Sequence, residues 1–314
     1  MLKIKNLKKY FALNRKQQVH AVDDVSFAIQ QHEVVGLVGE SGSGKSTLGK
    51  TLVGLLDKTE GEVCFKDNKL PSVYKPEDFK KYSQQIQMIF QDPYTSLNPR
   101  MTVEEIISEG LKLTGRYSSQ ETSDKVVEWL ENVGLNAAFL PRYPHEFSGG
   151  QRQRIGIARA MIIEPEFVVC DEPISAQDVS VQAQIINLLE KLKSSMGLTL
   201  LFIAHDLSMV RYISDRMAVM YLGKIVEIGP ANDVYFRAKH PYTEFLIAAN
   251  PEPDPELERH KIKHTIPGEI PSPINVKPGC RFASRCPKRM PECEHQTPQL
   301  KTVAEGHQVA CHLY

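Results

Sequence analysis

The feature that most constrains this chain is the stretch GESGSGKS at positions 39–46. The apolar run EVVGLVG leads into it and is typical of a buried parallel strand, and KSTLGKTLVGLL behind it has a helical pattern. A strand, a glycine-rich loop and a helix in this order fit the pattern G-x-x-x-x-G-K-[ST], which binds phosphate groups. The sequence therefore predicts an α/β fold organised around a nucleotide phosphate site.

Each part of this loop has a chemical reason to be there. Glycines let backbone N–H groups turn toward phosphate oxygens, and the start of the next helix favours an anion. Lys45 supplies a positive charge for the β- and γ-phosphates, and the Ser46 hydroxyl is placed to bind Mg²⁺. The alternative is a chance Gly/Ser-rich turn, which the flanking strand and helix disfavour. The predicted ATP-binding residues of the loop are Gly39, Ser41, Gly42, Ser43, Gly44, Lys45, Ser46 and Thr47.

Two carboxylates follow a second buried strand, EFVVCDEP at 166–173. Asp171 ends the apolar run, where a carboxylate can hold Mg²⁺ through water. Glu172 comes next and can orient and polarise an attacking water. An ordinary polar strand end is the alternative, but the phosphate loop favours the catalytic interpretation.

A second anion site is predicted in HEFSGGQRQRIGIARA (145–160). Ser148, Gly149 and Gly150, followed by Gln151, lie at the start of an expected helix, where a hydroxyl and free N–H groups can bind an anion. The sequence has only one phosphate loop, so two cradles make sense if two chains pair head to tail and each covers the γ-phosphate of the other. A simple helix N-cap is the alternative.

The remaining pattern is that of an α/β core with a helical insertion at about 92–160. Lys plus Arg equals Asp plus Glu, at 38 each, so no net field attracts nucleic acid or an anionic membrane. The basic N-terminus lacks the apolar stretch of a signal peptide, and the longest apolar runs are shorter than the ~18 residues of a spanning helix. We therefore expect a cytosolic protein that reaches any membrane through a partner. Further strands are expected at 25–29, 61–65, 86–90 and 198–204, and helices at 103–113, 123–135 and 179–196.

Cysteines gather near the end of the chain, behind a proline-rich and charged linker at 250–279. Stable disulfides are uncommon in the cytosol, so the cluster suggests a metal centre. No C-x-x-C pair is present, which weakens a zinc-ribbon interpretation, whereas four thiolates suit a [4Fe–4S] cluster. Zn²⁺, with His307 or His312 as a substitute ligand, and free thiols are the alternatives. The predicted ligands are Cys280, Cys286, Cys293 and Cys311, and the nearby Arg281, Arg285, Lys288 and Arg289 could offset a cluster's negative charge.

The segment FSGGQRQRIGIARA resembles the signature motif of ABC ATPases, whose usual form is LSGGQ; Phe147 replaces the leucine. The resemblance covers residues 1 to about 240. It implies a RecA-like P-loop core with an antiparallel β subdomain and an inserted α-helical subdomain. The expected domains are an ABC nucleotide-binding domain at 1–235, with its helical insertion at about 92–160, and a C-terminal cysteine-rich extension at 236–314.

The same resemblance implies roles for individual residues. Tyr10 would stack on the adenine, with Phe11 and His20 as alternatives. Gln91 in FQDP would be the Q-loop glutamine that senses Mg²⁺ and the attacking water, joining Ser46 and Asp171 at the Mg²⁺ site. Glu172 would be the catalytic glutamate and His205 the switch histidine at the γ-phosphate. The D-loop residues would be Ser175 and Asp178, with Gln177 where the family usually carries leucine.

A closer resemblance runs over almost the whole chain. QDPYTSLNPRMTV (91–103), DVSVQAQ (178–184) and IPGEIPSPINVKPGCRFASRCP (266–287) are similar to the F-type ATPase of bacterial dipeptide/oligopeptide permeases. This implies ATP-driven closure of two cassettes that energises peptide uptake, a groove for a coupling helix that is lined by the segment at 94–99, with Leu97 as the position expected to crosslink to a membrane subunit, and an iron–sulfur site in the tail.

The partners implied by this resemblance are a paralogous D-type ATPase, two transmembrane permease subunits and, indirectly, a substrate-binding protein. The implied location is peripheral, on the cytoplasmic face of the bacterial inner membrane. Uptake of nickel or of another small peptide-like substrate is an alternative. A non-transport ABC ATPase acting on DNA or ribosomes is less consistent with the sequence, which has no long coiled coil and no second cassette.

Overall fold

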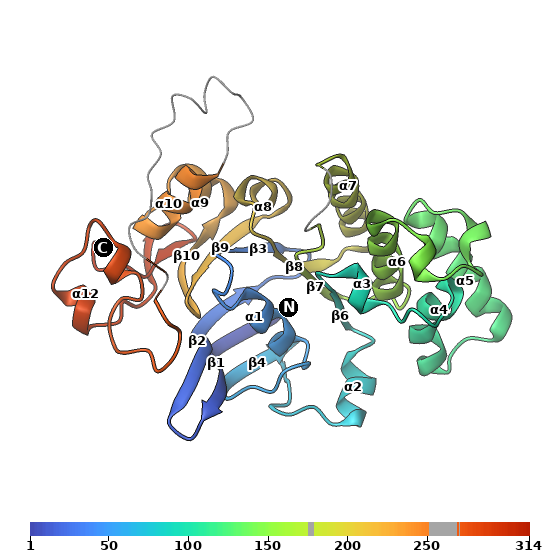
Figure 1. Ribbon diagram of the computed structural model, residues 1–314, viewed down its shortest axis with the longest axis horizontal. Coiled ribbons are helices and arrows are strands. Elements are labelled where there is room, and N and C mark those ends of the chain that lie inside the picture. The colour runs from blue at the N-terminus through green and yellow to red at the C-terminus, as the bar shows by residue number, and fades with distance from the viewer. Residues whose placement is uncertain (175–178, 251–268, 270) are drawn as a thin grey trace. The chain divides into compact units, whose positions relative to one another are not determined.

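The computed structural model describes residues 1–174, 179–250, 269 and 271–314 (Figure 1). It consists of two compact units. Unit 1 combines Met1–Val73 with Phe202–Tyr314, and unit 2 is Tyr74–Leu201.

The first sheet of unit 1 is antiparallel, with the strand order β2-β1-β4-β5. Leu2, Ile4 and Leu7 of its first strand are buried. The pairing of the first two strands shifts register between Ile4 and Leu7, so the alternation of buried and exposed residues breaks there. Its strands are β1 (Leu2–Asn14), β2 (Gln17–Ile29), β4 (Glu60–Phe65) and β5 (Asn68–Lys69).

The second sheet of unit 1 is mixed and includes the end of the chain. Strand β3 (Val34–Val38) pairs in parallel with β9 (Arg216–Tyr221), and β10 (Lys224–Pro230) pairs antiparallel with β9. Strand β12 (His307–Val309) pairs with β10, and β11 (Lys301–Ala304) pairs with β12. The last strands, red in Figure 1, therefore extend the sheet of unit 1.

Helices cover this second sheet. Helix α8 (Leu207–Ile213) lies so close to β3 that a Cβ at Gly36 would approach a methyl carbon of Val210 to 2.1 Å, which explains the glycine in the middle of a strand. Among its described residues, unit 1 also contains the helices α1 (Lys45–Leu52), α9 (Ala231–Phe236), α10 (Pro241–Ala249), α12 (Glu292–His295) and the 3₁₀ turn η3 (Ala283–Arg285).

Unit 2 contains two parallel strands and a group of helices. Strand β6 (Ile86–Ile89) pairs in parallel with β7 (Phe167–Asp171). Helices α4 (Val103–Thr114), α5 (Ser119–Asn132) and α6 (Gly149–Met161) contact one another and lie together in Figure 1. The unit also contains α2 (Pro76–Tyr82), α3 (Pro93–Ser96), α7 (Val179–Met196) and the 3₁₀ turns η1 (Ala137–Phe139) and η2 (Pro144–Glu146).

Strand β8 (Thr199–Ile203) begins in unit 2 and ends in unit 1. In unit 2 the N–H of Thr199 donates to the carbonyl of Glu166 at 3.1 Å, and in unit 1 the N–H of Ala204 donates to the carbonyl of Leu37 at 3.3 Å. The predicted strands at 61–65, 86–90 and 198–204 and the helix at 179–196 are confirmed. Among the described helices, none is long and apolar enough to cross a membrane.

Candidate active site

The phosphate loop joins β3 to α1 in unit 1, and its glycines are required by backbone geometry. Gly39 has φ 153° and Gly44 has φ 103°. A Cβ at Gly39 would approach the carbonyl oxygen of Met220 to 2.1 Å, and a Cβ at Gly44 would approach that of Ala21 to 2.0 Å. Gly42 has φ 77°, and a Cβ there would meet no atom within 4 Å. The first and third glycines therefore allow backbone to pass backbone, whereas the second has open space on its Cβ side.

Two polar side chains of the loop, those of Lys45 and Ser43, are buried. The Lys45 side chain is only 5% exposed, and its ammonium donates to the carbonyls of Gly39 at 2.7 Å and Glu40 at 3.0 Å. The Ser43 hydroxyl is also buried and has no hydrogen-bond partner among the described residues. Ser41 is exposed, and Ser46 and Thr47 are half-buried in the first turn of α1. The loop therefore presents a lysine and hydroxyl groups at the start of a helix, where an anion is favoured.

Tyr10 of β1, the predicted adenine-stacking residue, is held from two sides. Its ring stacks on the imidazole of His20 with the ring centroids 4.1 Å apart and an interplanar angle of 16°. Its hydroxyl donates to the carboxylate of Asp23, which also accepts from Arg281. Burial and the hydrogen bond to Asp23 raise the pKa of Tyr10. Burial opposes ionisation of Asp23, yet the Tyr10 hydrogen bond and the Arg281 charge bring its pKa below the usual value.

In unit 2 the predicted catalytic pair is in contact. The side-chain amide of Gln91 donates to a carboxylate oxygen of Glu172 at 2.8 Å. Asp171, at the end of β7, is 2% exposed. Glu172 has φ 43°, a left-handed conformation that is unfavourable for a residue with a side chain and is found preferentially at functional sites. Three of the residues predicted for catalysis and Mg²⁺ binding therefore lie at neighbouring positions in this unit.

The signature segment forms the N-terminal cap of α6. The Ser148 hydroxyl accepts from the N–H of Gln151 at 3.3 Å, while the Gln151 side chain accepts from the N–H of Ser148 at 3.0 Å. This reciprocal capping leaves Ser148 exposed and Gly149 and Gly150 half-buried.

In unit 1, His205 is exposed just after β8. The predicted D-loop residues Ser175 and Asp178, with Gln177, lie outside the described residues.

The segment that follows the Q-loop glutamine corrects one expectation. Leu97 was expected to line a groove for a membrane subunit, but it is 2% exposed. Tyr94 is 61% exposed instead, and the guanidinium of Arg152 lies 4.0 Å from its ring centroid. Asp92 caps α3 by accepting from the N–H of Tyr94 at 2.8 Å. The aromatic residue, not the leucine, is therefore the exposed apolar group of this segment.

The four tail cysteines share one neighbourhood in unit 1. The N–H of Cys280 donates to the carbonyl of Cys293 at 2.8 Å. Burial, with a further contribution from the other three thiols, raises the pKa of Cys280 to about 11, and burial also raises the pKa of Cys286 and Cys311. Across residues 1–174, 179–250, 269 and 271–314, however, no three His, Cys, Asp or Glu side chains are grouped closely enough to hold a metal ion.

The basic residues beside these cysteines have carboxylate partners of their own. Arg281 pairs with Asp23 and Arg285 with Glu40, while Lys288 pairs with Glu244 and Arg289 with Glu294. These carboxylate partners account for the four basic residues, so a negatively charged cluster is not needed to explain why they are there. No local sequence pattern indicates the first two pairs, because the partners are 258 and 245 residues apart. Arg285 and Tyr242 contact Glu40 of the phosphate loop, and Arg281 pairs with Asp23, the partner of Tyr10. Local sequence patterns did not predict these contacts.

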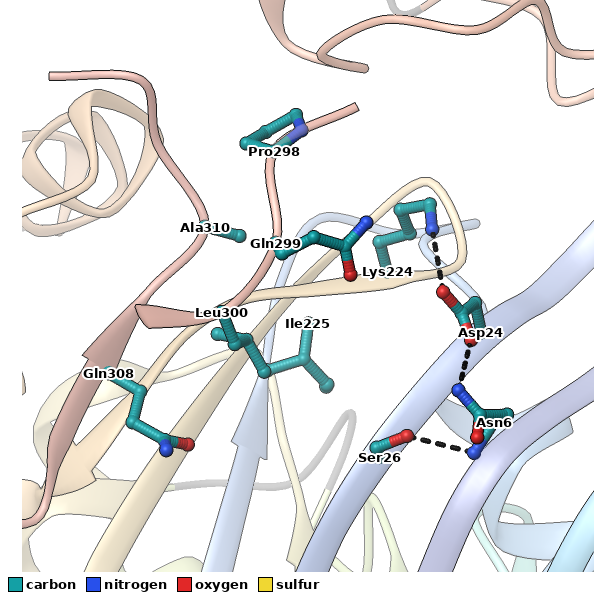
Figure 2. A pocket seen from close by; sticks show the side chains of 10 residues that line it. All are labelled: Asn6, Asp24, Ser26, Lys224, Ile225, Pro298, Gln299, Leu300, Gln308 and Ala310. Atoms are coloured by element: carbon teal, nitrogen blue, oxygen red, sulfur yellow. Dashed lines mark hydrogen bonds and ion pairs between the residues drawn. The ribbon is translucent and has the colours of Figure 1, made fainter. Parts of the chain in front are cut away.

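A cavity of about 310 Å³ lies between the tail and the first sheet of unit 1 (Figure 2). Its polar groups pair with one another: Lys224 with Asp24 at 3.8 Å, and the Asn6 side chain with Asp24 at 2.8 Å. The apolar floor includes Ile225 and Leu300. We assign no ligand to this cavity, since its charged groups already have partners.

Comparison with known proteins adds an independent result. A family model described as "ABC transporter" matches residues 22–175, and one described as "Oligopeptide/dipeptide transporter, C-terminal region" matches residues 226–293. The oligopeptide transport ATP-binding protein OppF of Haemophilus influenzae is 50% identical over 98% of this chain and 93% of its own length. The oligopeptide transport ATP-binding protein AppF of Bacillus subtilis is 47% identical over 100% of this chain and 97% of its own length.

A solved structure agrees with these sequence relatives. The ATP-binding cassette MJ0796, described as dimeric and bound to ADP and Pi after hydrolysis, has a TM-score of 0.68 and 30% sequence identity, covering 74% of this chain and 99% of that one. The α/β fold with a mixed sheet is thus the fold of an ABC nucleotide-binding domain. Given the phosphate loop, the Gln91–Glu172 pair and relatives that match along nearly the whole chain, this protein belongs to the family of ATP-binding subunits of ABC transporters.

Proposed function

We propose that this chain hydrolyses ATP to energise the uptake of dipeptides or oligopeptides by an ABC importer. The observation that carries the substrate class is the match of residues 226–293 to the C-terminal region of oligopeptide/dipeptide transporters, beside an ABC nucleotide-binding fold. Relatives that are 47% and 50% identical in sequence to this chain are named oligopeptide transport ATP-binding proteins. The catalytic residues in this chain belong to the energising step and do not contact the peptide.

The proposed hydrolysis gives each of the predicted site residues a separate role. The backbone N–H groups of the phosphate loop and Lys45 bind the triphosphate, and Tyr10 stacks on the adenine. Ser46, Gln91 and Asp171 would hold Mg²⁺, which neutralises charge on the β- and γ-phosphates. Glu172 accepts a hydrogen bond from the attacking water and takes its proton as the water oxygen bonds to the γ-phosphorus and the bond from the γ-phosphorus to the bridging oxygen breaks, which releases ADP and phosphate. His205 donates to the γ-phosphate, where negative charge is stabilised.

A second cassette completes the site in this proposal. The γ-phosphate bound by a partner cassette would be contacted by the signature residues Ser148, Gly149, Gly150 and Gln151. The N-terminus of α6 offers N–H groups and the positive end of the helix dipole. The Ser148–Gln151 capping contacts support this role, since they hold the hydroxyl at the helix start. Ser175 and Asp178 would join the two sites. We propose a paralogous D-type ATPase as the partner.

We further propose that the complex sits on the cytoplasmic face of the bacterial inner membrane. Two permease subunits would receive the closure of the cassettes as a rigid-body shift, and a substrate-binding protein would deliver the peptide. The proposed domain division is a nucleotide-binding domain at 1–235, with its helical insertion at about 92–160, and a C-terminal extension at 236–314. We propose that Tyr94, which is exposed and follows the Q-loop glutamine, contacts a permease.

The tail cysteines are proposed to hold a metal centre, with a [4Fe–4S] cluster as the first choice and Zn²⁺ as the alternative. Four thiols in one neighbourhood support the donor set, and burial raises the pKa of Cys280, Cys286 and Cys311. The present spacing would have to contract to bring at least three of them to one ion. When bound, the centre would supply a structural crosslink for the tail.

Peptide uptake by cells tests the transport function. Cells that lack this chain should take up a labelled tripeptide poorly, and the wild-type chain should restore uptake. Chains carrying Lys45→Ala or Glu172→Gln should not restore it although they are produced at the same level. Uptake that is unchanged without the chain, or that is restored by both variants, would refute the proposed function.

A further inference from the structure

Two arginines of the C-terminal tail reach the parts of unit 1 that the nucleotide would contact. Arg281 and Arg285 flank Phe282, which is 1% exposed and packs against Tyr221 and Tyr242 with ring centroids 5.4 Å apart in each case. The buried phenylalanine fixes this tail segment on the unit. The side chains on either side of it are therefore held in place, and each points to a different nucleotide-binding element.

Arg285 forms a two-point contact with the phosphate loop. Its guanidinium donates to both carboxylate oxygens of Glu40, at 2.9 and 3.1 Å, and to the hydroxyl of Tyr221 at 3.3 Å. The Arg285 side chain is 6% exposed and that of Glu40 is 24% exposed. A parallel, two-bond contact of this kind is the strongest geometry for an arginine and a carboxylate. The loop's only acidic residue is thus neutralised by the tail.

The backbone of Glu40 is held as well. Its N–H donates to the hydroxyl of Tyr242 at 2.8 Å, and its carbonyl accepts from the ammonium of Lys45 at 3.0 Å. Side chain, N–H and carbonyl of one residue are therefore fixed by three different groups. If the Arg285 contact were lost, a bare carboxylate would remain beside a site for a triphosphate, and like charges repel.

Arg281 makes a similar contact on the adenine side. It donates to the carbonyl of Leu222 at 2.6 Å and pairs with Asp23, the acceptor of the Tyr10 hydroxyl. The tail also lies along the neighbouring hairpin, because the N–H of His20 donates to the carbonyl of Pro273 at 3.0 Å. Both ends of the nucleotide site within unit 1 are thus braced by residues 273–285.

We infer that the tail is a positioning element for the nucleotide, in which Arg285 acts through Glu40 to keep the phosphate loop ready for the triphosphate of Mg-ATP. The inference rests on the proposed function, because it assumes that this loop binds ATP. Arg285 is a positioning residue and does not itself contact the reacting atoms. Its loss should raise the dissociation constant for Mg-ATP and the KM of hydrolysis while leaving kcat almost unchanged, since the Gln91–Glu172 pair is untouched.

A double-mutant cycle on the full chain tests this. Titration calorimetry should show that Arg285→Ala weakens Mg-ATP binding about tenfold or more, which corresponds to about 1.4 kcal/mol. Glu40→Gln, which removes the unpaired charge, should restore most of the affinity when combined with Arg285→Ala. Arg285→Lys should give an intermediate value, because it keeps the charge and loses the two-point geometry. Thermal unfolding of each variant shows whether it is folded. If Arg285→Ala does not fold, Glu40→Gln alone still tests the contact, because it leaves the sequence of the tail unchanged.

Lys288→Ala is the matched control. Lys288 lies in the same tail segment and pairs with Glu244 at 2.8 Å, but both side chains are largely exposed and neither touches the phosphate loop. It should bind Mg-ATP as the wild type does. Wild-type affinity in Arg285→Ala, or additive losses in the double variant, would overturn the inference alone, provided that the wild-type chain binds Mg-ATP and Lys45→Ala does not. Failure of the wild-type chain to bind Mg-ATP would overturn the proposed function as well.

Discussion

The side-chain amide of Gln91 donates a hydrogen bond to the carboxylate of Glu172 at 2.8 Å, although the two residues are 81 positions apart in the chain. Gln91 follows β6 and Glu172 follows β7, and these strands are parallel neighbours. The carboxyl ends of parallel strands lie at the same edge of a sheet, which brings the two side chains together. The contact keeps the carboxylate at a fixed place, and the left-handed backbone of Glu172 gives it a fixed direction.

Glu172→Gln should retain Mg-ATP binding and lose at least about a hundredfold in turnover, because an amide cannot take a proton from water. Steady-state hydrolysis by the assembled complex, with the partner cassette's own site silenced, measures this. Gln91→Glu offers a useful comparison, since it places two carboxylates side by side and should weaken Mg-ATP binding when the metal is limiting. Full turnover in Glu172→Gln would show that another group is the base.

Tyr94, rather than Leu97, should report contact with a permease subunit. A cysteine at position 94 would be accessible, because the side chain it replaces is 61% exposed, and it should crosslink to cysteines in the cytoplasmic loops of the membrane subunits. A cysteine at position 97 should react slowly even with a small maleimide, since Leu97 is 2% exposed. Efficient crosslinking from 97 with none from 94 would reverse this assignment.

His240 gives the fold a predictable acid sensitivity. Burial lowers the pKa of its imidazole from 6.5 to about 4, although the charge of Glu227 acts in the opposite direction. Its Nδ1 accepts from the N–H of Tyr242 at 3.1 Å, so the folded chain needs the neutral ring at the start of α10. The unfolded chain takes up this proton below about pH 6.5 and the folded chain does not, so stability falls as the pH drops from 6.5 toward 4.

The size of this effect can be measured by urea unfolding at several pH values. At about 1.4 kcal/mol per pH unit, His240 should account for a loss of roughly 3 kcal/mol across its full range. His240→Asn keeps an acceptor for the helix cap and should flatten that part of the pH dependence. His145→Asn, a change at an exposed histidine, should leave the dependence as it is. Identical pH profiles for wild type and His240→Asn would contradict the assignment.

Local sequence patterns predicted the phosphate loop, β7 and α7, but they did not predict β1 or the strands of the tail. The phosphate loop has fixed spacing and two flanking elements, and β7 and α7 have apolar runs that need no long-range information. Strand β1 escaped notice because lysines at positions 3, 5, 8 and 9 mix with its apolar residues and the register shifts after Ile4. No strand was predicted in the tail. Its β12 strand depends on an edge that β10 offers, which a sequence window does not contain.

For the candidate active site as well, residues within a short motif could be predicted, whereas contacts between distant residues could not. Residues fixed by a short motif, such as Lys45 and Ser148, could be predicted because each motif contains its own geometry. The partners of Arg281 and Arg285 could not, since a salt bridge between residues more than 200 positions apart leaves no local pattern. The burial of Leu97 likewise depends on how α3 rests on its surroundings, where Arg159 donates to the carbonyl of Ser96 at 2.6 Å.

The four tail cysteines are predicted to hold a [4Fe–4S] cluster in protein purified without oxygen. Four thiolate ligands match the requirement of such a cluster, and a tail with few apolar residues would gain stability from the crosslink. Analysis should find about four irons with acid-labile sulfide per chain, and Cys286→Ser should lose both. Cys64→Ser is the control, because Cys64 lies in β4 and outside the tail. One tightly bound zinc without sulfide would assign the site to Zn²⁺ instead. A chain with neither metal would refute the metal centre and leave free thiols, of which Cys280, with its pKa raised by burial to about 11, is a poor nucleophile at neutral pH.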